Sequence, residues 1–259
     1  MLLEVKDLNI SLTSGKSVAE HISFQLAQGE MLSIVGSSGA GKTTICKAIM
    51  GLLGNTYRAD GEILFQGEDL LDLPERKRQT IYGKEICLIM QNPMTAFNPS
   101  IRVGRQLEKT YLLHRGKTPR QEMQRLLAAI LQKLGLEDTQ RILNSYPFTL
   151  SGGMLQRLMI AAALMCQPAL LVADEATTAI DACNRIGLMR ELKSFCKDGM
   201  SVLFVTHDLR SASVSDRILV MDRGQIVEQD TTERILNAPK EDYTKYLLNA
   251  CRLERREMS

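Results

Sequence analysis

A glycine-rich stretch between a strand-like run and a helix-like segment most constrains the fold of this chain. The stretch GSSGAGKTT spans residues 36–44 and follows the apolar run 31–35. The segment after it has a helical spacing of apolar residues, at Ile45, Ala48, Ile49 and Leu52. Glycines allow tight turns, so that successive N–H groups and the helix N-terminus can point at one anion, while Lys42 adds charge near the β- and γ-phosphates. The pattern predicts a nucleoside triphosphate cradle made of Gly36, Ser37, Ser38, Gly39, Ala40, Gly41, Lys42, Thr43 and Thr44. The Thr43 hydroxyl is placed to hold Mg²⁺.

Length and composition favour a globular protein that does not cross a membrane by itself. The chain has 259 residues, of which 44% are hydrophobic, enough to fill a large α/β core. Its 32 basic and 30 acidic residues are well mixed, so a net charge of +2 gives no field favouring nucleic acid. The longest apolar stretch, residues 158–173, is broken by Gln167 and Pro168 and is too short to span a bilayer. The N-terminus lacks the basic start and apolar centre of a signal peptide, and we expect a cytoplasmic protein.

The first third of the chain has strand patterns around the cradle. Residues 2–12 and 18–28 have the pattern of two strands joined by a turn at residues 14–16. A second turn is expected at 59–61, before a short strand at 62–65. The predicted fold class is therefore α/β, with an N-terminal antiparallel β subdomain ahead of the phosphate-binding core.

From residue 97 to 146 the strand patterns disappear. Apolar residues recur at helical spacing over 122–134, which predicts an inserted α-helical subdomain. We expect the core to comprise residues 1–96 and 147–230, the insert residues 97–146, and the C-terminal part, 231–259, two short helices and a tail.

Polar side chains follow three of the predicted buried strands. Gln91 follows the strand 85–90, Asp174 and Glu175 follow 170–173, and His207 follows 200–205. In α/β proteins ligands bind at the carboxyl ends of the strands, and charged carboxylates there are costly unless a cation or a water uses them. Beside a phosphate cradle, Asp174 is expected to face Mg²⁺, Glu175 the attacking water and His207 the γ-phosphate.

A second helix start is a candidate anion site. Ser151 can cap the helix that follows it, and Gly152 and Gly153 would leave its first amides open to an anion. Further on, Asp181 opens another helix, where it is either an ordinary N-cap or a functional residue.

The order and spacing of these features resemble the nucleotide-binding subunit of ABC transporters. In order they are the loop 36–44, Gln91, LSGGM at 150–154, LLVADE at 170–175, AID at 179–181 and His207. The resemblance covers nearly the whole chain, to about Leu248. It implies a P-loop NTPase core that is RecA-like, with the antiparallel β and helical subdomains.

The resemblance also implies roles for the site residues. ATP would be held by Lys42 and the loop amides, Mg²⁺ by Thr43, Gln91 and Asp174, and Glu175 would be the general base, with His207 bracing the γ-phosphate. Ser151, Gly152, Gly153 and Asp181 would act on the nucleotide of a partner subunit, because in this family two such subunits meet head to tail.

The implied partners follow from the family. They are a second, related ABC ATPase subunit, two membrane permeases and an extracytoplasmic substrate-binding protein, with this chain peripheral on the cytoplasmic face of the cell membrane. Among branches of the family, SYPFTLSGGMLQR, MQNPMTAFNP and DYTKYLL are similar to the peptide and nickel importers. LSGGMLQR and AFNP favour an ATPase for nickel or a metal chelate. The alternatives are a dipeptide or oligopeptide importer and, less favoured, a soluble ABC ATPase of DNA repair or translation.

Three positions depart from the family pattern. Ala176 follows Glu175 where the family usually has Pro, and Ile180 replaces the usual Leu. No aromatic residue lies between Leu8 and Ile22, so the usual stacking partner for adenine is missing and Leu12 offers only apolar contact.

Overall fold

A six-stranded sheet forms the centre of the molecule. The computed structural model describes residues 1–176 and 182–257. The strand order is β10-β9-β3-β8-β7-β6, parallel throughout except for β10 at the edge, which is antiparallel to β9. The strands are β3 (Met31–Gly36), β6 (Ile86–Ile89), β7 (Leu170–Asp174), β8 (Ser201–Thr206), β9 (Arg217–Asp222) and β10 (Gln225–Thr231). The central strands are continuous apolar runs because parallel sheets are covered on both faces.

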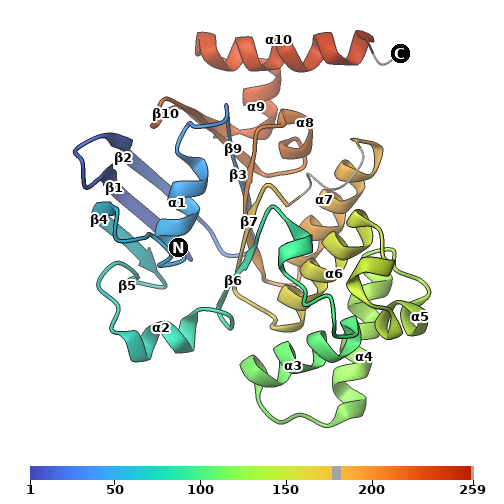
Figure 1. The fold of residues 1–259 in the computed structure, drawn as a ribbon. Helices are drawn as coiled ribbons and strands as arrows, with labels where there is room; N and C mark the ends of the chain where they lie inside the picture. The colour runs from blue at the N-terminus through green and yellow to red at the C-terminus, as the bar shows by residue number, and fades with distance from the viewer. Residues whose placement is uncertain (177–181, 258–259) are drawn as a thin grey trace.

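A smaller antiparallel sheet lies to one side of the central sheet, with α1 (Lys42–Ile49) between the two sheets (Figure 1). Its order is β2-β1-β4-β5, with β1 (Leu3–Leu12), β2 (Ser17–Leu26), β4 (Tyr57–Phe65) and β5 (Glu68–Asp69). The predicted turn at 59–61 is wrong, because β4 runs through it. Gly61 has φ +108°, and a Cβ there would lie 2.5 Å from the Asp7 carbonyl oxygen, where the β1–β4 register shifts. The glycine serves a bulge rather than a turn.

The core helices follow the expected pattern with one exception. They are α1 (Lys42–Ile49), α2 (Glu75–Ile81), α6 (Gly152–Met165), α7 (Ala182–Cys196) and α8 (Leu209–Ala212). Leu52 was expected on the inner face of α1, but the helix ends at Ile49 and Leu52 is 56% exposed. Gly51, at φ +63°, turns the chain away before Leu52 can reach the core.

The segment between β6 and α6 is helical, as the sequence predicts. It contains α3 (Val103–Arg115), α4 (Arg120–Lys133) and α5 (Thr139–Asn144), with 3₁₀ turns η1 (Pro93–Thr95) and η2 (Pro147–Thr149) at its two ends. These helices lie to one side of the core and pack on α6 (Figure 1). The division of the chain at residues 97, 146 and 230 stays a prediction.

Two apolar clusters cover the two faces of the central sheet. Alternate residues of each buried strand point to opposite sides: Leu171 and Ala173 of β7 belong to the cluster with α6, α7 and the helical segment, whereas Leu170 and Val172 belong to the cluster with α1 and the antiparallel sheet. Both faces of β7 are therefore covered by apolar side chains. The polar residues of this segment lie at its carboxyl end. Over the described residues, the helices are too short or too polar to cross a bilayer.

The C-terminal part differs from the expected pair of short helices. α9 (Thr232–Asn237) is short, but α10 (Asp242–Glu257) is a long amphipathic helix. It lies across the end of the molecule where the carboxyl ends of the central strands emerge (Figure 1).

Candidate functional site

The glycine-rich loop connects the end of β3 to the start of α1, as predicted. Gly39 and Gly41 have φ values of +84° and +95°, which only glycine adopts freely. In the described part of the chain, the loop amides without an acceptor are the N–H groups of Ser38, Gly39, Gly41, Lys42 and Thr43. Open amides at a helix N-terminus form an anion site, because the N–H dipoles and the helix dipole both favour negative charge. The loop has the properties of the predicted phosphate cradle.

Lys42 is folded back onto the loop it follows. Its ammonium group donates hydrogen bonds to the carbonyl oxygens of Gly36, at 2.9 Å, and Ser37, at 2.8 Å. The residue is only 4% exposed, and this burial lowers the pKa of Lys42 from its ordinary value, while the carboxylates of Glu175 and Asp174 act in the opposite direction. A buried ammonium beside open amides provides the positive charge that a phosphate chain requires.

Thr43 and Asp174 meet at the carboxyl end of the sheet. The Thr43 hydroxyl donates a hydrogen bond of 3.1 Å to the Asp174 carboxylate, joining α1 to β7. Burial raises the pKa of Asp174, and the hydrogen bond from Thr43 opposes that shift. A hydroxyl and a carboxylate oxygen are hard donors of the kind Mg²⁺ prefers, and a divalent cation would relieve the burial of the Asp174 charge. The residues present therefore fit a Mg²⁺ ion.

Glu175 lies between two polar side chains from neighbouring strands. Gln91 Nε2 donates to one carboxylate oxygen at 2.6 Å, and His207 Nδ1 lies 3.2 Å from the other. Parallel pairing of β6, β7 and β8 places the ends of these strands next to one another. Glu175 has φ +49°, a left-handed conformation that is strained for a non-glycine residue. A carboxylate held from two sides at the mouth of a phosphate cradle can accept a proton from a water molecule.

The helix start at residue 151 forms as predicted but is separate from this group. The Ser151 hydroxyl accepts a hydrogen bond from the Met154 amide at 3.3 Å and so caps α6, whose first turn contains Gly152 and Gly153. Over residues 1–176 and 182–257, no hydrogen bond joins these three residues to the cradle or to Glu175. Asp181 lies outside the described residues, as does Ile180. The structure thus brings together one group of predicted site residues and leaves the α6 start apart.

The sequence prediction missed two aromatic side chains near this region. The N–H group of Ser37 donates a 3.0 Å hydrogen bond to the hydroxyl of Tyr243 in α10, more than 200 residues away in the sequence. Tyr57 in β4 pairs directly with Leu12 of β1, so an aromatic ring neighbours the position where the sequence offers only Leu12. Neither contact has a local sequence signal, because both depend on pairing between distant segments.

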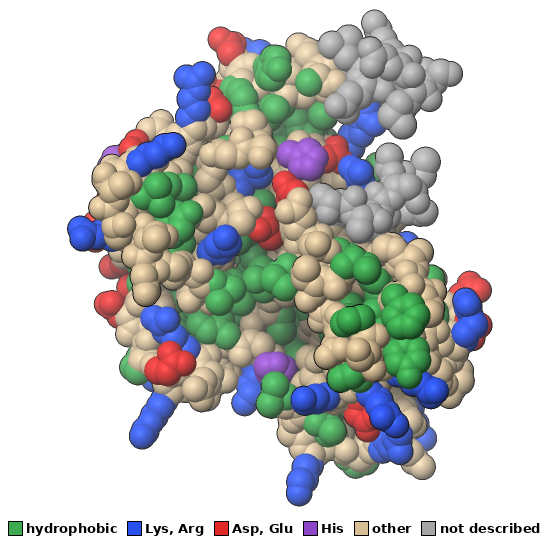
Figure 2. Space-filling view, viewed as in Figure 1, with side chains coloured by type: hydrophobic (Ala, Val, Ile, Leu, Met, Phe, Trp, Pro, Cys, Tyr) green, Lys and Arg blue, Asp and Glu red, His purple; other side chains and the backbone are tan. Residues whose placement is uncertain are grey.

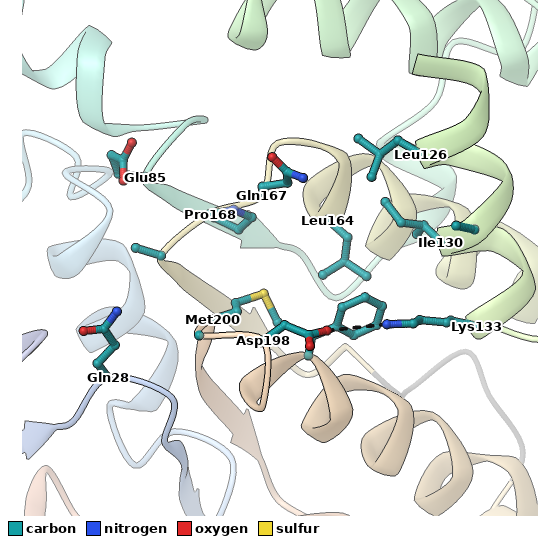
Figure 3. Close-up of a pocket in the computed structure, with 14 residues that line it drawn as sticks. Gln28, Glu85, Leu126, Ile130, Lys133, Leu164, Gln167, Pro168, Asp198 and Met200 are labelled. Carbon is teal, nitrogen blue, oxygen red and sulfur yellow. Dashed lines mark hydrogen bonds and ion pairs between the residues drawn. The ribbon is translucent and has the colours of Figure 1, made fainter. Parts of the chain in front are cut away.

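A cavity of about 490 Å³ lies elsewhere in the molecule, between α4, α6 and the end of α7 (Figure 3). Leu126, Ile130 and Leu164 contribute apolar walls, and Lys133 lies 3.5 Å from the Asp198 carboxylate at its edge. None of the predicted site residues lines it. The phosphate cradle, rather than this cavity, therefore defines the candidate site.

Comparison with known proteins gives consistent similarities. The profile of the ABC transporter family matches residues 19–178. The chain is 41% identical over 251 residues to the metal-staphylopine import system ATP-binding protein CntD of Staphylococcus aureus, covering 96% of this chain and 92% of that protein. It is also 41% identical over 255 residues to the dipeptide transport ATP-binding protein DppD of Haemophilus influenzae, covering 96% and 77%. Among solved structures, the ATP-binding cassette MJ0796, dimeric and bound to ADP and phosphate, has a TM-score of 0.78 at 27% identity, covering 89% of this chain and 98% of that one.

Proposed function

The chain belongs to the ABC transporter family and is an ABC importer ATPase, and from this premise we propose that it couples ATP hydrolysis to the uptake of nickel or a metal-chelate complex. The observation that carries the ATPase activity is the position of Glu175, held by Gln91 and His207 beside the Thr43–Asp174 pair. The metal specificity is supported by LSGGMLQR and AFNP and by the similarity to the metal-staphylopine importer.

A dipeptide or oligopeptide importer is the alternative. The dipeptide relative has the same 41% identity as the metal-staphylopine relative, so overall identity does not separate the two solutes. A soluble ABC ATPase of DNA repair or translation is not favoured, because the helical segment of about 50 residues lacks the sustained heptads of a coiled-coil arm. On the face shown in Figure 2, basic and acidic side chains are interspersed, and this mixture does not favour nucleic acid as a partner.

The chemistry assigned to the site is in-line hydrolysis of the terminal phosphate. Lys42 and the open amides of Ser38, Gly39, Gly41, Lys42 and Thr43 bind the phosphate chain of ATP and compensate its charge. Thr43, Asp174 and the amide oxygen of Gln91 would hold Mg²⁺, which neutralises charge on the β- and γ-phosphates. Glu175 accepts the proton of the attacking water, and His207 keeps the Glu175 carboxylate oriented and reaches the γ-phosphate.

The site in this chain is half of a working site. The Ser151, Gly152 and Gly153 start of α6 makes no hydrogen bond with the cradle in the described chain, yet it forms its own capped helix N-terminus. We assign it, together with Asp181, to the nucleotide of a second, related ATPase subunit in a head-to-tail pair. ATP then joins the two halves, and its hydrolysis releases them.

The remaining partners are two membrane permeases and an extracytoplasmic substrate-binding protein, with this chain peripheral on the cytoplasmic face of the membrane. Large apolar side chains are exposed close to Gln91 and Ser151 in the sequence: Met90 is 47%, Met94 56% and Phe148 67% exposed. Apolar side chains also gather over the α5–α6 part of the face in Figure 2. Exposed apolar groups of this kind mark protein contacts, and they support permease docking on this side.

The test reconstitutes the chain with its partner ATPase, permeases and substrate-binding protein in lipid vesicles and measures ATP hydrolysis. Glu175→Gln should lower kcat by about 100-fold or more while ATP still binds, because only the proton acceptor is lost. Unchanged hydrolysis in that variant would refute the catalytic assignment. Uptake of radioactive nickel, alone or chelated, against uptake of a labelled dipeptide then decides the solute.

A further inference from the structure

The C-terminal helix α10 is attached to the phosphate loop. Its apolar face packs on a small cluster that includes Val35, the residue directly before the loop, and Leu209 of α8. The side chains of α10 in this contact are Tyr243, Leu247, Leu248 and Cys251. The end of β3 and the start of α8 therefore share one apolar support, which α10 completes.

Both ends of this contact are fixed by polar groups. Before the first turn of α10, the Glu228 carboxylate of β10 accepts hydrogen bonds from the amides of Lys240, at 2.8 Å, and Glu241, at 3.2 Å. Further along, Arg210 of α8 donates a 2.5 Å hydrogen bond to the carbonyl oxygen of Cys251. Because Arg210 follows His207 by three residues, α10 spans from the phosphate loop to the segment that carries His207.

Tyr243 and Lys42 hold opposite ends of one peptide unit. The N–H group of Ser37 donates to the Tyr243 hydroxyl at 3.0 Å, and the carbonyl of Gly36, in the same peptide, accepts from Lys42 Nζ at 2.9 Å. A peptide unit is planar and rigid, so fixing its N–H fixes the direction of its C=O. The Tyr243 hydroxyl thus sets the orientation of the carbonyl that holds the Lys42 ammonium. Of the amides that follow, those of Ser38, Gly39, Gly41, Lys42 and Thr43 are left open for phosphate.

We propose that Tyr243 is a positioning residue for ATP binding, which acts on Lys42 through the Gly36–Ser37 peptide and couples α10 to occupancy of the phosphate loop. The inference rests on the proposed function, since it assigns ATP to this loop. Tyr243 does not touch the reacting atoms. Without the Tyr243 hydroxyl, the Gly36–Ser37 peptide rotates more freely, and the Lys42 ammonium is less well ordered. ATP binding must then order Lys42, which lowers the affinity for ATP. By thermodynamic linkage, bound ATP must also favour the packing of α10 against Val35 and α8 by the same factor.

The test compares Tyr243→Phe with Tyr246→Phe in the full chain, assembled with its partner ATPase and permeases. Tyr246 is the matched control, because it stacks on Tyr243 with ring centroids 6.4 Å apart but is 67% exposed. Loss of one hydrogen bond predicts a KM for ATP about fivefold higher in Tyr243→Phe, with kcat at saturating ATP within twofold of wild type. Tyr246→Phe should leave both constants unchanged. Hydrogen exchange at the Ser37 amide should be faster in Tyr243→Phe alone.

The possible results separate a failure of the Tyr243 inference from a failure of the proposed function. Equal KM values in the two tyrosine variants would overturn the inference, and a lower KM in Tyr243→Phe would show instead that the hydroxyl competes with phosphate. A wild-type complex that fails to hydrolyse ATP, or a Lys42→Ala variant that binds ATP as tightly as wild type, would overturn the proposed function itself. Lys42→Ala losing ATP binding while Tyr243→Phe behaves as wild type would overturn only the role of Tyr243.

Discussion

The Gln91 amide nitrogen lies 2.6 Å from Glu175 Oε2, across the ends of two parallel strands. The two residues are 84 positions apart in the sequence, and only the pairing of β6 with β7 brings them into contact. The hydrogen bond fixes one oxygen of the carboxylate, while His207 contacts the other. The orientation of the Glu175 carboxylate, the proposed proton acceptor, therefore depends on residues outside its own strand.

Gln91→Ala should lower kcat for ATP hydrolysis by about 10-fold or more, because it lets the Glu175 carboxylate rotate away from the reactive geometry and also removes a proposed Mg²⁺ ligand. The KM for ATP should change by less than about threefold, since Lys42 and the loop amides remain. Steady-state kinetics of the assembled complex give both constants. Gln132→Ala, at an exposed position of α4, is the control, and equal kcat values for the two variants would rule out the positioning role of Gln91.

Replacing Glu175 by glycine should stabilise the isolated fold while abolishing hydrolysis. Its φ of +49° is strained for glutamate by about 1 kcal/mol and free for glycine, which predicts a melting temperature about 2–4 °C higher. Glu175→Ala removes the same side-chain contacts with Gln91 and His207 but keeps the strain, so the difference between the alanine and glycine variants isolates the backbone effect. Scanning calorimetry of the chain without nucleotide measures it. Identical melting temperatures for the two variants would contradict the strain.

Two glycines of the phosphate loop should respond differently to alanine. A Cβ on Gly36 would lie 2.2 Å from the carbonyl oxygen of Met221, so Gly36→Ala must move β3 away from β9. A Cβ on Gly39 meets nothing within 4 Å, and Gly39→Ala costs only the positive φ of +84°. Urea denaturation should show losses of about 3 kcal/mol and about 1 kcal/mol, respectively. Equal losses would mean that backbone conformation alone explains both glycines.

The packing of α10 against the rest of the chain should weaken in acid. Burial tends to raise the pKa of Glu228, but the hydrogen bonds that its carboxylate accepts, among them those from the amides of Lys240 and Glu241, outweigh it and leave the pKa below its ordinary value. A lowered folded-state pKa means that the stabilisation is fully present above the ordinary pKa and is lost as the pH falls through the folded value. The stability difference between wild type and Glu228→Gln should therefore be largest at neutral pH and shrink below about pH 4.

Chemical denaturation across pH 3–7 measures that difference. Glu233→Gln, at an exposed position of α9, is the matched control and should show no such pH-dependent difference. A difference for Glu228→Gln that stays constant with pH would show that its carboxylate charge does not hold α10.

Much of the site could be predicted because its residues lie at fixed places in local patterns. Gly36, Lys42 and Thr43 occupy a strand–loop–helix unit whose geometry is local, and Asp174, Glu175 and His207 follow apolar runs that had to be buried strands. The prediction of a turn at 59–61 was wrong because glycine is common both in turns and in β-bulges. Only the pairing of β4 with β1 distinguishes the two. The prediction that Leu52 lies on the inner face of α1 was wrong because the spacing of apolar residues does not indicate where a helix ends.

The sequence by itself predicted a cradle for a nucleoside triphosphate and the strand ends that supply its polar groups, and it determined the family to which the chain belongs. The tertiary structure alone decided that Gln91 and His207 hold the two oxygens of Glu175 and that α10 returns to the start of the phosphate loop. The reason is physical. Local motifs are encoded by neighbouring residues, whereas the Ser37–Tyr243 contact joins segments that share no local pattern and meet only because both pack on the apolar cluster around Val35.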